Sequence, residues 1–434
     1  MTADLLARRF ATIGRHSPLF YDEPVHLVSG SGVWLTDAAG RRYLDAYNNV
    51  PHVGHAHPRV VEAMCRQAAT LNIHTRYLNE RVVEYAEALL GRFEPGLDRV
   101  LFTNSGSEAN ELAFRIAMQH TGARGILVTD FSYHGNTSLL AGATTGLRTH
   151  EGLAEHVRAF AVPDLDAAHN AGADPVAVRD EALRAVDRSI AELQREGHGV
   201  AAVIIESIFS TEGLPRVPEG FVEGVAERVR AAGGLVIGDE VQAGLGRTGR
   251  TFWGYQRYAL VPDLVTLGKP LGNGHPLAAV VTTQGLLEEF GSRNEYFNTF
   301  AGNPVSSAVG LEVLRVIDDE GLVPRAVELG DLVRTELAAL TDRYDELGPV
   351  KGDGLFFGFS VFADTAHTRP DPDRTRRVVE AVKERGVLLS RIGPTGSVLK
   401  IRPPLAIRGE EIRMLIDVLS SAVESVWAGG RNEP

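Results

Sequence analysis

The first candidate for chemistry is Lys269, which follows an apolar run and stands among glycines and a proline in TLGKPLGNG, residues 266–274. A lysine at the end of a buried strand, in partly dry surroundings, can act as an amine nucleophile. The segment is not a Walker phosphate loop, because Pro270 stands where that loop needs serine or threonine. An exposed loop lysine without a chemical role is the alternative reading of the same residues.

A second candidate is Asp239, which ends the apolar run LVIGD at residues 235–239 and is followed by Glu240. In open α/β sheets, ligands bind beyond the carboxyl ends of the strands. A carboxylate at such a place is costly unless it meets a cation or a hydrogen-bond donor. We therefore expect Asp239 either to bind a charged group of a ligand or to act as a helix-capping or ion-paired aspartate.

A phosphate site is indicated at Ser105, Gly106 and Ser107, which join an apolar run to a helical pattern in LFTNSGSEAN, residues 101–110. The first amide groups of a helix are unpaired and lie at the positive end of its dipole. Two serines and a glycine at that point can surround a phosphate. An ordinary helix start, with Ser105 or Ser107 as its cap and Glu108 in its first turn, explains the same residues.

Two further patterns resemble known sites without their context. The segment GLGRTG at residues 244–249 matches the dinucleotide fingerprint. However, residues 239–243 separate the predicted strand from the first glycine of this segment, and no clean amphipathic helix follows it. We expect a mobile loop at the mouth of the site instead. His52, His55 and His57 have no carboxylate or cysteine at useful spacing, and a zinc site needs three or four converging ligands. We therefore expect no metal there.

The lysine, the strand-end carboxylate, the serine-glycine turn and a Tyr133-His134-Gly135 turn together suit pyridoxal phosphate. The aldehyde of this cofactor needs an amine, and its pyridine nitrogen needs an anion that keeps it protonated. Its phosphate needs amides and hydroxyls, and its ring needs side chains on both faces, one of them aromatic.

The elements that must position these residues alternate between strand and helix through the middle of the chain. Unbroken apolar runs with helices between them predict a mostly parallel sheet that is covered on both faces. The predicted strands are residues 99–103, 125–129, 200–206, 235–239, 263–267 and 277–282, and the predicted helices are residues 108–119 and 219–232.

The two ends of the chain have a different character. Residues 25–45 carry hairpin signals, and from about residue 310 long helical patterns alternate with short strands. The predicted fold class is therefore α/β, with a large domain at residues 55–310. A smaller α+β domain is expected from residues 1–54 and 311–434.

Composition narrows the possible partners. The 434 residues include 44 lysines and arginines against 56 acidic residues, so the net charge of −12 gives no footprint for nucleic acid or an anionic membrane. The longest apolar runs are shorter than the roughly 18 residues that a membrane span needs. The single cysteine, Cys65, fits a reducing compartment. We expect a soluble cytoplasmic protein that acts on a small molecule.

The chain resembles the class III aminotransferase family of the fold type I pyridoxal-phosphate superfamily, from about Phe20 to the C-terminus. The resemblance is carried by segments that occur in the family's order: YLDAYNNVPHVGHAHP, TNSGSEANELAFRIA, YHG, GDEVQAGLGRTG, LVTLGKPLGNGHPLAAV and NTFAGNPVSSAVGL.

This resemblance implies a role for each residue of the site. Lys269 would bind the cofactor aldehyde as a Schiff base and later move a proton, and Asp239 would pair with the pyridine nitrogen. Tyr133 and Val241 would cover the two ring faces, and Gln242 would contact the phenolic oxygen. The remaining cofactor residues are Ser105, Gly106, Ser107 and His134, with Thr299 reaching the phosphate of a partner subunit. A homodimer with shared sites, or a tetramer, is implied.

Two departures from the family indicate that its usual carboxylate-binding switch is missing. Thr211 stands where many of its aminotransferases have a switch glutamate, and Lys400 stands where an arginine often binds a substrate carboxylate. The chain is most similar to phospho-lyases that act on O-phosphoethanolamine and phosphohydroxylysine. Elimination of phosphate from a phosphorylated amine is therefore expected, with Arg76 as the first choice for the substrate anion and Lys400 and Arg402 as further candidates.

Two alternatives stay open on the sequence. One is a class III ω-aminotransferase that uses an amine donor and a keto acid acceptor. The other is a protein that binds pyridoxal phosphate without catalysing a reaction.

Overall fold

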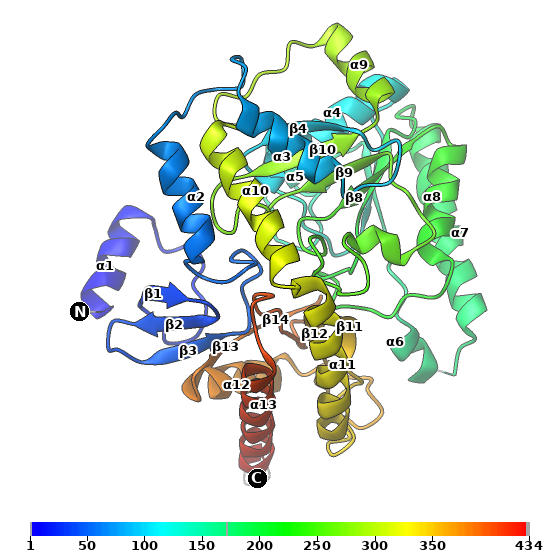
Figure 1. Ribbon diagram of the computed structural model, residues 1–434. Coiled ribbons are helices and arrows are strands. Elements are labelled where there is room, and N and C mark those ends of the chain that lie inside the picture. Colours follow the sequence, from blue (N-terminus) through cyan, green and yellow to red (C-terminus); the bar gives the residue numbers. More distant parts are fainter. Residues whose placement is uncertain (1, 171, 431–434) are drawn as a thin grey trace.

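The computed structural model describes residues 2–170 and 172–430. At its centre lies a seven-stranded sheet in the order β4-β10-β9-β8-β7-β5-β6 (Figure 1). All of its strands run in the same direction except β10, which is antiparallel to both of its neighbours. The strands are β4 (Arg99–Thr103), β5 (Ile126–Thr129), β6 (Val157–Phe160), β7 (Ala202–Glu206), β8 (Leu235–Asp239), β9 (Leu264–Leu267) and β10 (Ala278–Thr282).

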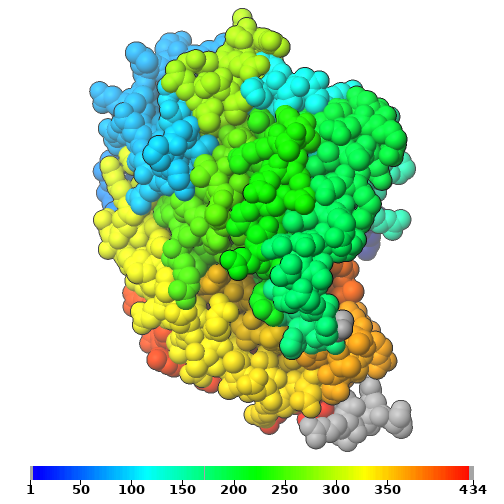
Figure 2. Space-filling view, turned by 90° about the vertical axis from the view of Figure 1, so that its right-hand side faces the viewer, coloured from blue at the N-terminus to red at the C-terminus, as the bar shows by residue number. Residues whose placement is uncertain are grey.

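Helices cover both faces of this sheet because its strands are apolar on both sides. Ala202 and Ile204 of β7 pack in a cluster with α4 (Gly106–Thr121) and α9 (Gln284–Arg293). Val203 and Ile205 point the other way and pack in a cluster with α7 (Pro175–Arg195) and α8 (Phe221–Ala231). In Figure 2 the green residues from the middle of the chain form the upper right part of the face shown.

The second part of the molecule joins the two ends of the chain. A four-stranded sheet has the order β1-β2-β3-β13, and β13 pairs in parallel with β3. Its helices α12 and α13 lie below the large sheet in Figure 1, beside the C-terminus. The elements are β1 (Leu27–Ser31), β2 (Trp34–Asp37), β3 (Arg42–Asp45), β11 (Lys351–Asp353), β12 (Phe356–Gly358), β13 (Val387–Leu388), β14 (Ser390–Ile392), β15 (Val398–Lys400), α11 (Leu322–Thr341), α12 (Pro372–Glu384) and α13 (Gly409–Gly430).

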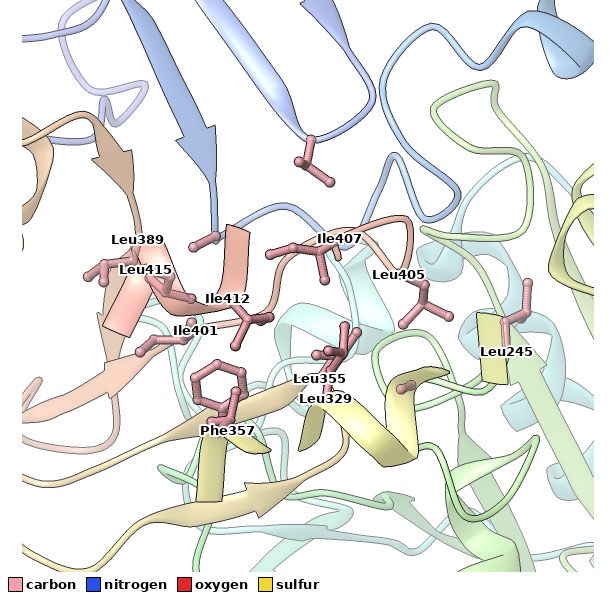
Figure 3. Packing of buried hydrophobic residues seen from close by; sticks show 14 of the residues in the cluster. Leu245, Leu329, Leu355, Phe357, Leu389, Ile401, Leu405, Ile407, Ile412 and Leu415 are labelled. Carbon is pink, nitrogen blue, oxygen red and sulfur yellow. The ribbon is translucent and has the colours of Figure 1, made fainter. Parts of the chain in front are cut away.

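One hydrophobic cluster extends across both parts. Figure 3 shows Leu245 of the middle of the chain packed in the same cluster as Leu355, Leu405 and other residues of the C-terminal third. We propose a division of the chain at residues 55 and 310, because each part has its own sheet. The remaining helices are α1 (Thr2–Thr12), α2 (Pro58–Ala68), α3 (Glu80–Leu90), α5 (Ser138–Ala141), α6 (Leu165–Asn170), α10 (Pro304–Asp319) and the 3-10 turn η1 (Gly254–Arg257).

The mostly parallel sheet and its strand positions are confirmed, with two additions. The strand β6 had no prediction, and β10 runs antiparallel to β9. The connection from β9 to β10 spans residues 268–277. A parallel strand needs a crossover of a dozen residues or more, usually with a helix, so this short connection returns the chain in the opposite direction.

Among the described residues, no helix combines the length and the apolar character that a membrane crossing requires.

The expectation of a mobile loop at residues 244–249 is wrong. Leu245 and Arg247 are buried, at 1% and 0% exposure. Arg247 donates hydrogen bonds to the carbonyl oxygens of Leu355 and Pro403 in the C-terminal third. The glycines of the segment allow this close approach, since a Cβ at Gly249 would lie 2.9 Å from the amide nitrogen of Val327. The segment ties the two parts of the molecule together.

Candidate active site

A pocket of about 180 Å³ lies where the parallel strands of the large sheet end. The chain leaves β4, β5, β7, β8 and β9 at this edge, and each of these strand ends supplies part of the wall. Such an edge is where open α/β sheets bind their ligands. The lining residues are Gly106, Ser107, Asn110, Tyr133, His134, Gly135, Glu206, Asp239, Val241, Gln242 and Lys269.

Lys269 follows β9 and projects into this pocket, where its side chain is accessible to solvent. The protein packed around the amine, together with the Arg402 guanidinium, lowers the pKa of Lys269 below its ordinary value. Asp239 and Glu206 act in the opposite direction. A lysine with a lowered pKa has a larger share of the neutral amine, which is the nucleophilic and basic form.

Asp239 is the last residue of β8 and is only 3% exposed. One carboxylate oxygen accepts hydrogen bonds from the side chains of His134, at 2.7 Å, and Asn110, at 3.1 Å. The other oxygen accepts from the backbone amide of Val241 at 3.0 Å. These three donors fix the carboxylate at the strand end while it still lines the pocket, so it can meet a cationic group of a ligand.

Asn110 is a site residue that the sequence reading missed. It lies in α4, four residues after Gly106, and residues at this spacing share one face of a helix. That spacing from the serine-glycine turn was the available signal. Asn110 Nδ2 also donates to the backbone carbonyl oxygen of His134 at 2.7 Å, so it holds both members of the His134–Asp239 pair.

The two serines at the start of α4 have different positions, one capping the helix and one lining the pocket. Ser105 is the helix cap and accepts from the backbone amide of Glu108 at 3.2 Å, and it does not line the pocket. Gly106 and Ser107 do line it. A Cβ at Gly106 would lie 3.1 Å from Val241, so a side chain there would narrow the space at the helix N-terminus. This turn suits a bound phosphate, because amides and the positive end of α4 face the pocket.

Tyr133 and Val241 supply the aromatic and the aliphatic wall that a flat ring needs. Tyr133 is 38% exposed, whereas Val241 is 6% exposed. His134 also lines the pocket, but its Nδ1 is already engaged in the hydrogen bond to Asp239.

Gln242 connects the pocket to two buried cations. Its amide oxygen accepts hydrogen bonds from Arg402 and from Lys400, the latter at 3.4 Å. Its amide nitrogen donates to Ser210 Oγ at 2.5 Å. Lys400 and Arg402 are each 5% exposed, so two candidates for the substrate anion lie directly behind a pocket residue. The role of Ser210 as a partner of Gln242 had no sequence signal.

Acidic residues surround the same region. Glu206, at the end of β7, accepts from the backbone amide of Ser210 at 2.6 Å, and burial raises its pKa. Glu212 accepts from the hydroxyl of Thr129, and its surroundings raise its pKa to about 8. Thr211, at the switch position, packs beside Gly146. A Cβ added at Gly146 would lie 2.8 Å from Thr211 Cγ2.

Arg76 and Thr299 also do not line the pocket of their own chain. Arg76 is exposed, and its guanidinium carbon lies 3.8 Å from the centre of the Phe297 ring. Both residues line a separate groove between α3 and the segment around residue 298. Thr299 is also exposed, next to Phe300.

The histidines of residues 52–57 have separate partners: His52 bonds to Leu245 and Arg247, His55 to Asp45, and His57 to Glu320.

Comparison with known proteins identifies this arrangement. Residues 20–423 match the sequence profile of aminotransferase class-III. The chain belongs to this family. It is 37% identical to a Drosophila melanogaster protein named alanine–glyoxylate aminotransferase 2-like, over 92% of this chain and 82% of the relative. It is 34% identical to ethanolamine-phosphate phospho-lyase homolog 1 of Caenorhabditis elegans, over 97% and 93% of the two chains.

A solved structure is more similar still. A phospholyase from Arthrobacter, in complex with phosphoethanolamine, shares 57% identity and superposes with a TM-score of 0.95, covering 97% of this chain and all 100% of that one. The fold is therefore that of the fold type I pyridoxal-phosphate enzymes, and the protein is an enzyme that depends on this cofactor. The pocket suits it, since it combines an amine, a strand-end carboxylate, a helix N-terminus and two ring-covering side chains.

Proposed function

We propose that this enzyme is a phospho-lyase that eliminates phosphate from O-phosphoethanolamine or a similar phosphorylated amine, giving an aldehyde, ammonia and phosphate. The observation that carries the proposal is the pair of buried cations, Lys400 and Arg402, behind Gln242. The 57% identity to a phospholyase that binds phosphoethanolamine supports the same substrate. Thr211 fits this reading too, because it cannot hold an arginine aside as the switch glutamate does.

We assign the roles of the pocket residues from their positions. Bound pyridoxal phosphate supplies a protonated ring that withdraws electrons from the substrate carbon beside the amine. Asp239 keeps the ring nitrogen protonated, and Gly106 and Ser107 hold the cofactor phosphate. Lys269 takes the proton from that carbon, which its lowered pKa favours.

The substrate phosphate needs cations near the pocket. We infer that Lys400 and Arg402 provide them, because both side chains donate hydrogen bonds to Gln242, which lines the pocket. Arg76 remains a candidate, supplied by the second chain of a dimer rather than by its own chain.

We also propose a homodimer. The segment that holds Thr299 exposes Phe300 at 71%, and the facing segment exposes Leu78 at 103% and Tyr77 at 60%. Apolar side chains gathered on one face are typical of a surface that another chain covers. A second copy seated there would bring Thr299 to its neighbour's cofactor phosphate. The cytoplasm is the proposed location, on the ground of the single cysteine.

The proposal is tested by product analysis. The enzyme loaded with cofactor is mixed with O-phosphoethanolamine in the absence of any keto acid, and free phosphate and acetaldehyde are measured. Both products should accumulate in equal amounts over many turnovers. Lys269→Ala should abolish them and the yellow absorbance of the bound cofactor, whereas Lys351→Ala, which changes a lysine paired with Asp164 away from the pocket, should keep that absorbance. Absence of phosphate release ends the proposal.

An aminotransferase remains the second candidate, favoured by the Drosophila relative's name and by the shared cofactor pocket. The same Lys269 serves both reactions, because the proton that it removes can be returned to the cofactor instead. Amine consumption that requires added pyruvate or 2-oxoglutarate, without phosphate release, would select this alternative.

A further inference from the structure

Lys400 is a buried amine without an acid partner. It ends β15, is 5% exposed, and makes one hydrogen bond, to Gln242 Oε1 at 3.4 Å. Among the described residues, no carboxylate oxygen lies within 4.0 Å of the Lys400 amine, the distance that defines an ion pair. Lys351 shows the ordinary arrangement, because it is also buried, at 9% exposure, but is paired with Asp164 at 2.7 Å. A buried ammonium that lacks such a partner is strongly unfavourable, because burial removes its water without supplying an opposite charge.

Four charged groups face Lys400. Arg402 and Lys269 repel a proton on its amine, while Glu206 and Glu212 attract one. Burial and the two cations prevail, and they set the pKa of Lys400 well below its ordinary value. A dianion that enters beside the amine reverses this balance. The amine is thus arranged to take up a proton when a phosphate binds and to give it up when the charge changes.

The proposed reaction needs a proton at its leaving group. A phosphate monoester is mostly a dianion at neutral pH, since its second pKa is about 6. If only its carbon–oxygen bond broke, phosphate would leave as a trianion, which is a poor leaving group. A proton placed on the bridging oxygen lets it leave as hydrogen phosphate, a dianion.

We propose that Lys400 is the proton donor to the departing phosphate, an inference that rests on the proposed phosphate elimination. Lys269 takes the proton from the carbon that bears nitrogen, and the electron pair of that bond becomes the new carbon–carbon double bond. The carbon–oxygen bond breaks with its pair on oxygen. That oxygen receives the proton of the Lys400 ammonium, which is left as the neutral amine and is protonated again from water.

The neighbouring groups are less suited to this step. The guanidinium of Arg402 keeps its protons in proteins, so it can bind the phosphate but not donate to it. Lys269 is the base of the same elimination. Glu206 and Glu212 are acids with raised pKa values, that of Glu212 being about 8, but Glu206 accepts from the backbone amide of Ser210 and Glu212 is engaged with Thr129. The experiments therefore separate Lys400 from Glu212.

The first experiment compares two leaving groups. Lys400→Arg keeps a cation that binds an anion but removes the group that can donate a proton. Elimination from O-phosphoethanolamine should fall at least about 100-fold, the lower range for general acid catalysis. Elimination from 2-aminoethyl sulfate should change by less than about 3-fold, because sulfate leaves as a dianion without a proton. An equal fall with both substrates, or no fall with either, overturns the proposal.

The second experiment measures protons directly. Inorganic phosphate is bound to the enzyme loaded with cofactor at about pH 8, above its second pKa, in buffers of different ionisation enthalpy. Calorimetry should show uptake of about one proton in the wild type and much less in Lys400→Arg. Equal uptake in both overturns the proposal.

Two control variants sharpen both experiments. Lys351→Arg should behave as the wild type, because that lysine is paired with Asp164. Glu212→Gln should keep both the phosphate reaction and the proton uptake. Loss of both in Glu212→Gln, with Lys400→Arg unaffected, would give the donor role to Glu212 instead. If the wild type releases no phosphate, the proposed function fails; if it releases phosphate and Lys400→Arg does so equally well, only this inference fails.

Discussion

At the scale of single residues, the His134–Asp239 pair is the most direct test of the cofactor pocket. His134→Phe removes the 2.7 Å hydrogen bond to the carboxylate and leaves Asn110 in place. A hydrogen bond to a charged group contributes about 1.5–3 kcal/mol, so we expect kcat to fall roughly 10- to 100-fold. The measurement is steady-state kinetics beside the absorbance of the bound cofactor.

The control for this variant is His120→Phe, which changes an exposed histidine paired with Glu289 at 2.6 Å. We expect it to change kcat less than about 2-fold, because exposed ion pairs contribute little. If His134→Phe lowers the melting temperature but leaves kcat intact, the pair is structural and does not tune the ring.

Glu212 predicts a pH dependence of stability. Its pKa is raised from 4.5 to about 8 in the folded protein, so the folded state holds a proton that the unfolded state releases. The contribution to stability is fully present below pH 4.5 and is lost as the pH rises through about 8. We expect the melting temperature of the wild type to fall more steeply over this range than that of Glu212→Gln. Glu62→Gln, at an exposed ion pair with Arg66, should follow the wild type, and parallel curves for all three proteins would contradict the prediction.

At the scale of elements, the approach of the lysine loop to the start of α4 controls the phosphate site. A Cβ at Gly268 would lie 3.2 Å from both Cα and N of Gly106. Gly268→Ala should push the first turn of α4 away from the pocket. Overpacking of this kind costs about 1–3 kcal/mol, so the dissociation constant of the cofactor should rise about 5-fold or more. Titration of the apoprotein with pyridoxal phosphate measures it.

The matched variant is Gly285→Ala, since a Cβ at that helical glycine in α9 meets nothing within 4 Å. It should leave cofactor binding unchanged and stabilise the helix slightly. Equal cofactor affinity in both variants would show that the close approach of Gly268 and Gly106 does not matter for binding.

At the scale of the whole molecule, the exposed apolar face around Phe300 predicts assembly. Phe300→Asp places a charge on a side chain that is 71% exposed in a single chain. If a second copy covers this face, the variant should sediment as a monomer and bind the cofactor more weakly, because the neighbour's Thr299 is lost. Val176→Asp, at a residue that is 52% exposed on α7, should keep the state of the wild type. A variant at position 300 that sediments like the wild type would exclude this interface.

The sequence by itself determined the strand ends and most of the residues that stand on them. Lys269, Asp239 and the serine-glycine turn follow apolar runs directly, and such runs predict buried strands from local periodicity alone. The helix cap at Ser105 is likewise local, since it involves residues three apart. These features need no knowledge of distant neighbours.

The tertiary structure alone decided which partners these residues meet. Asn110 and Asp239 are 129 positions apart, and Lys400 and Gln242 are 158 positions apart. Packing likewise buried Arg247 against carbonyl oxygens 108 and 156 positions away, where the glycine-rich segment had predicted mobility. Hydrogen bonds between such distant residues depend on how layers pack, and periodicity along the chain contains no record of that packing.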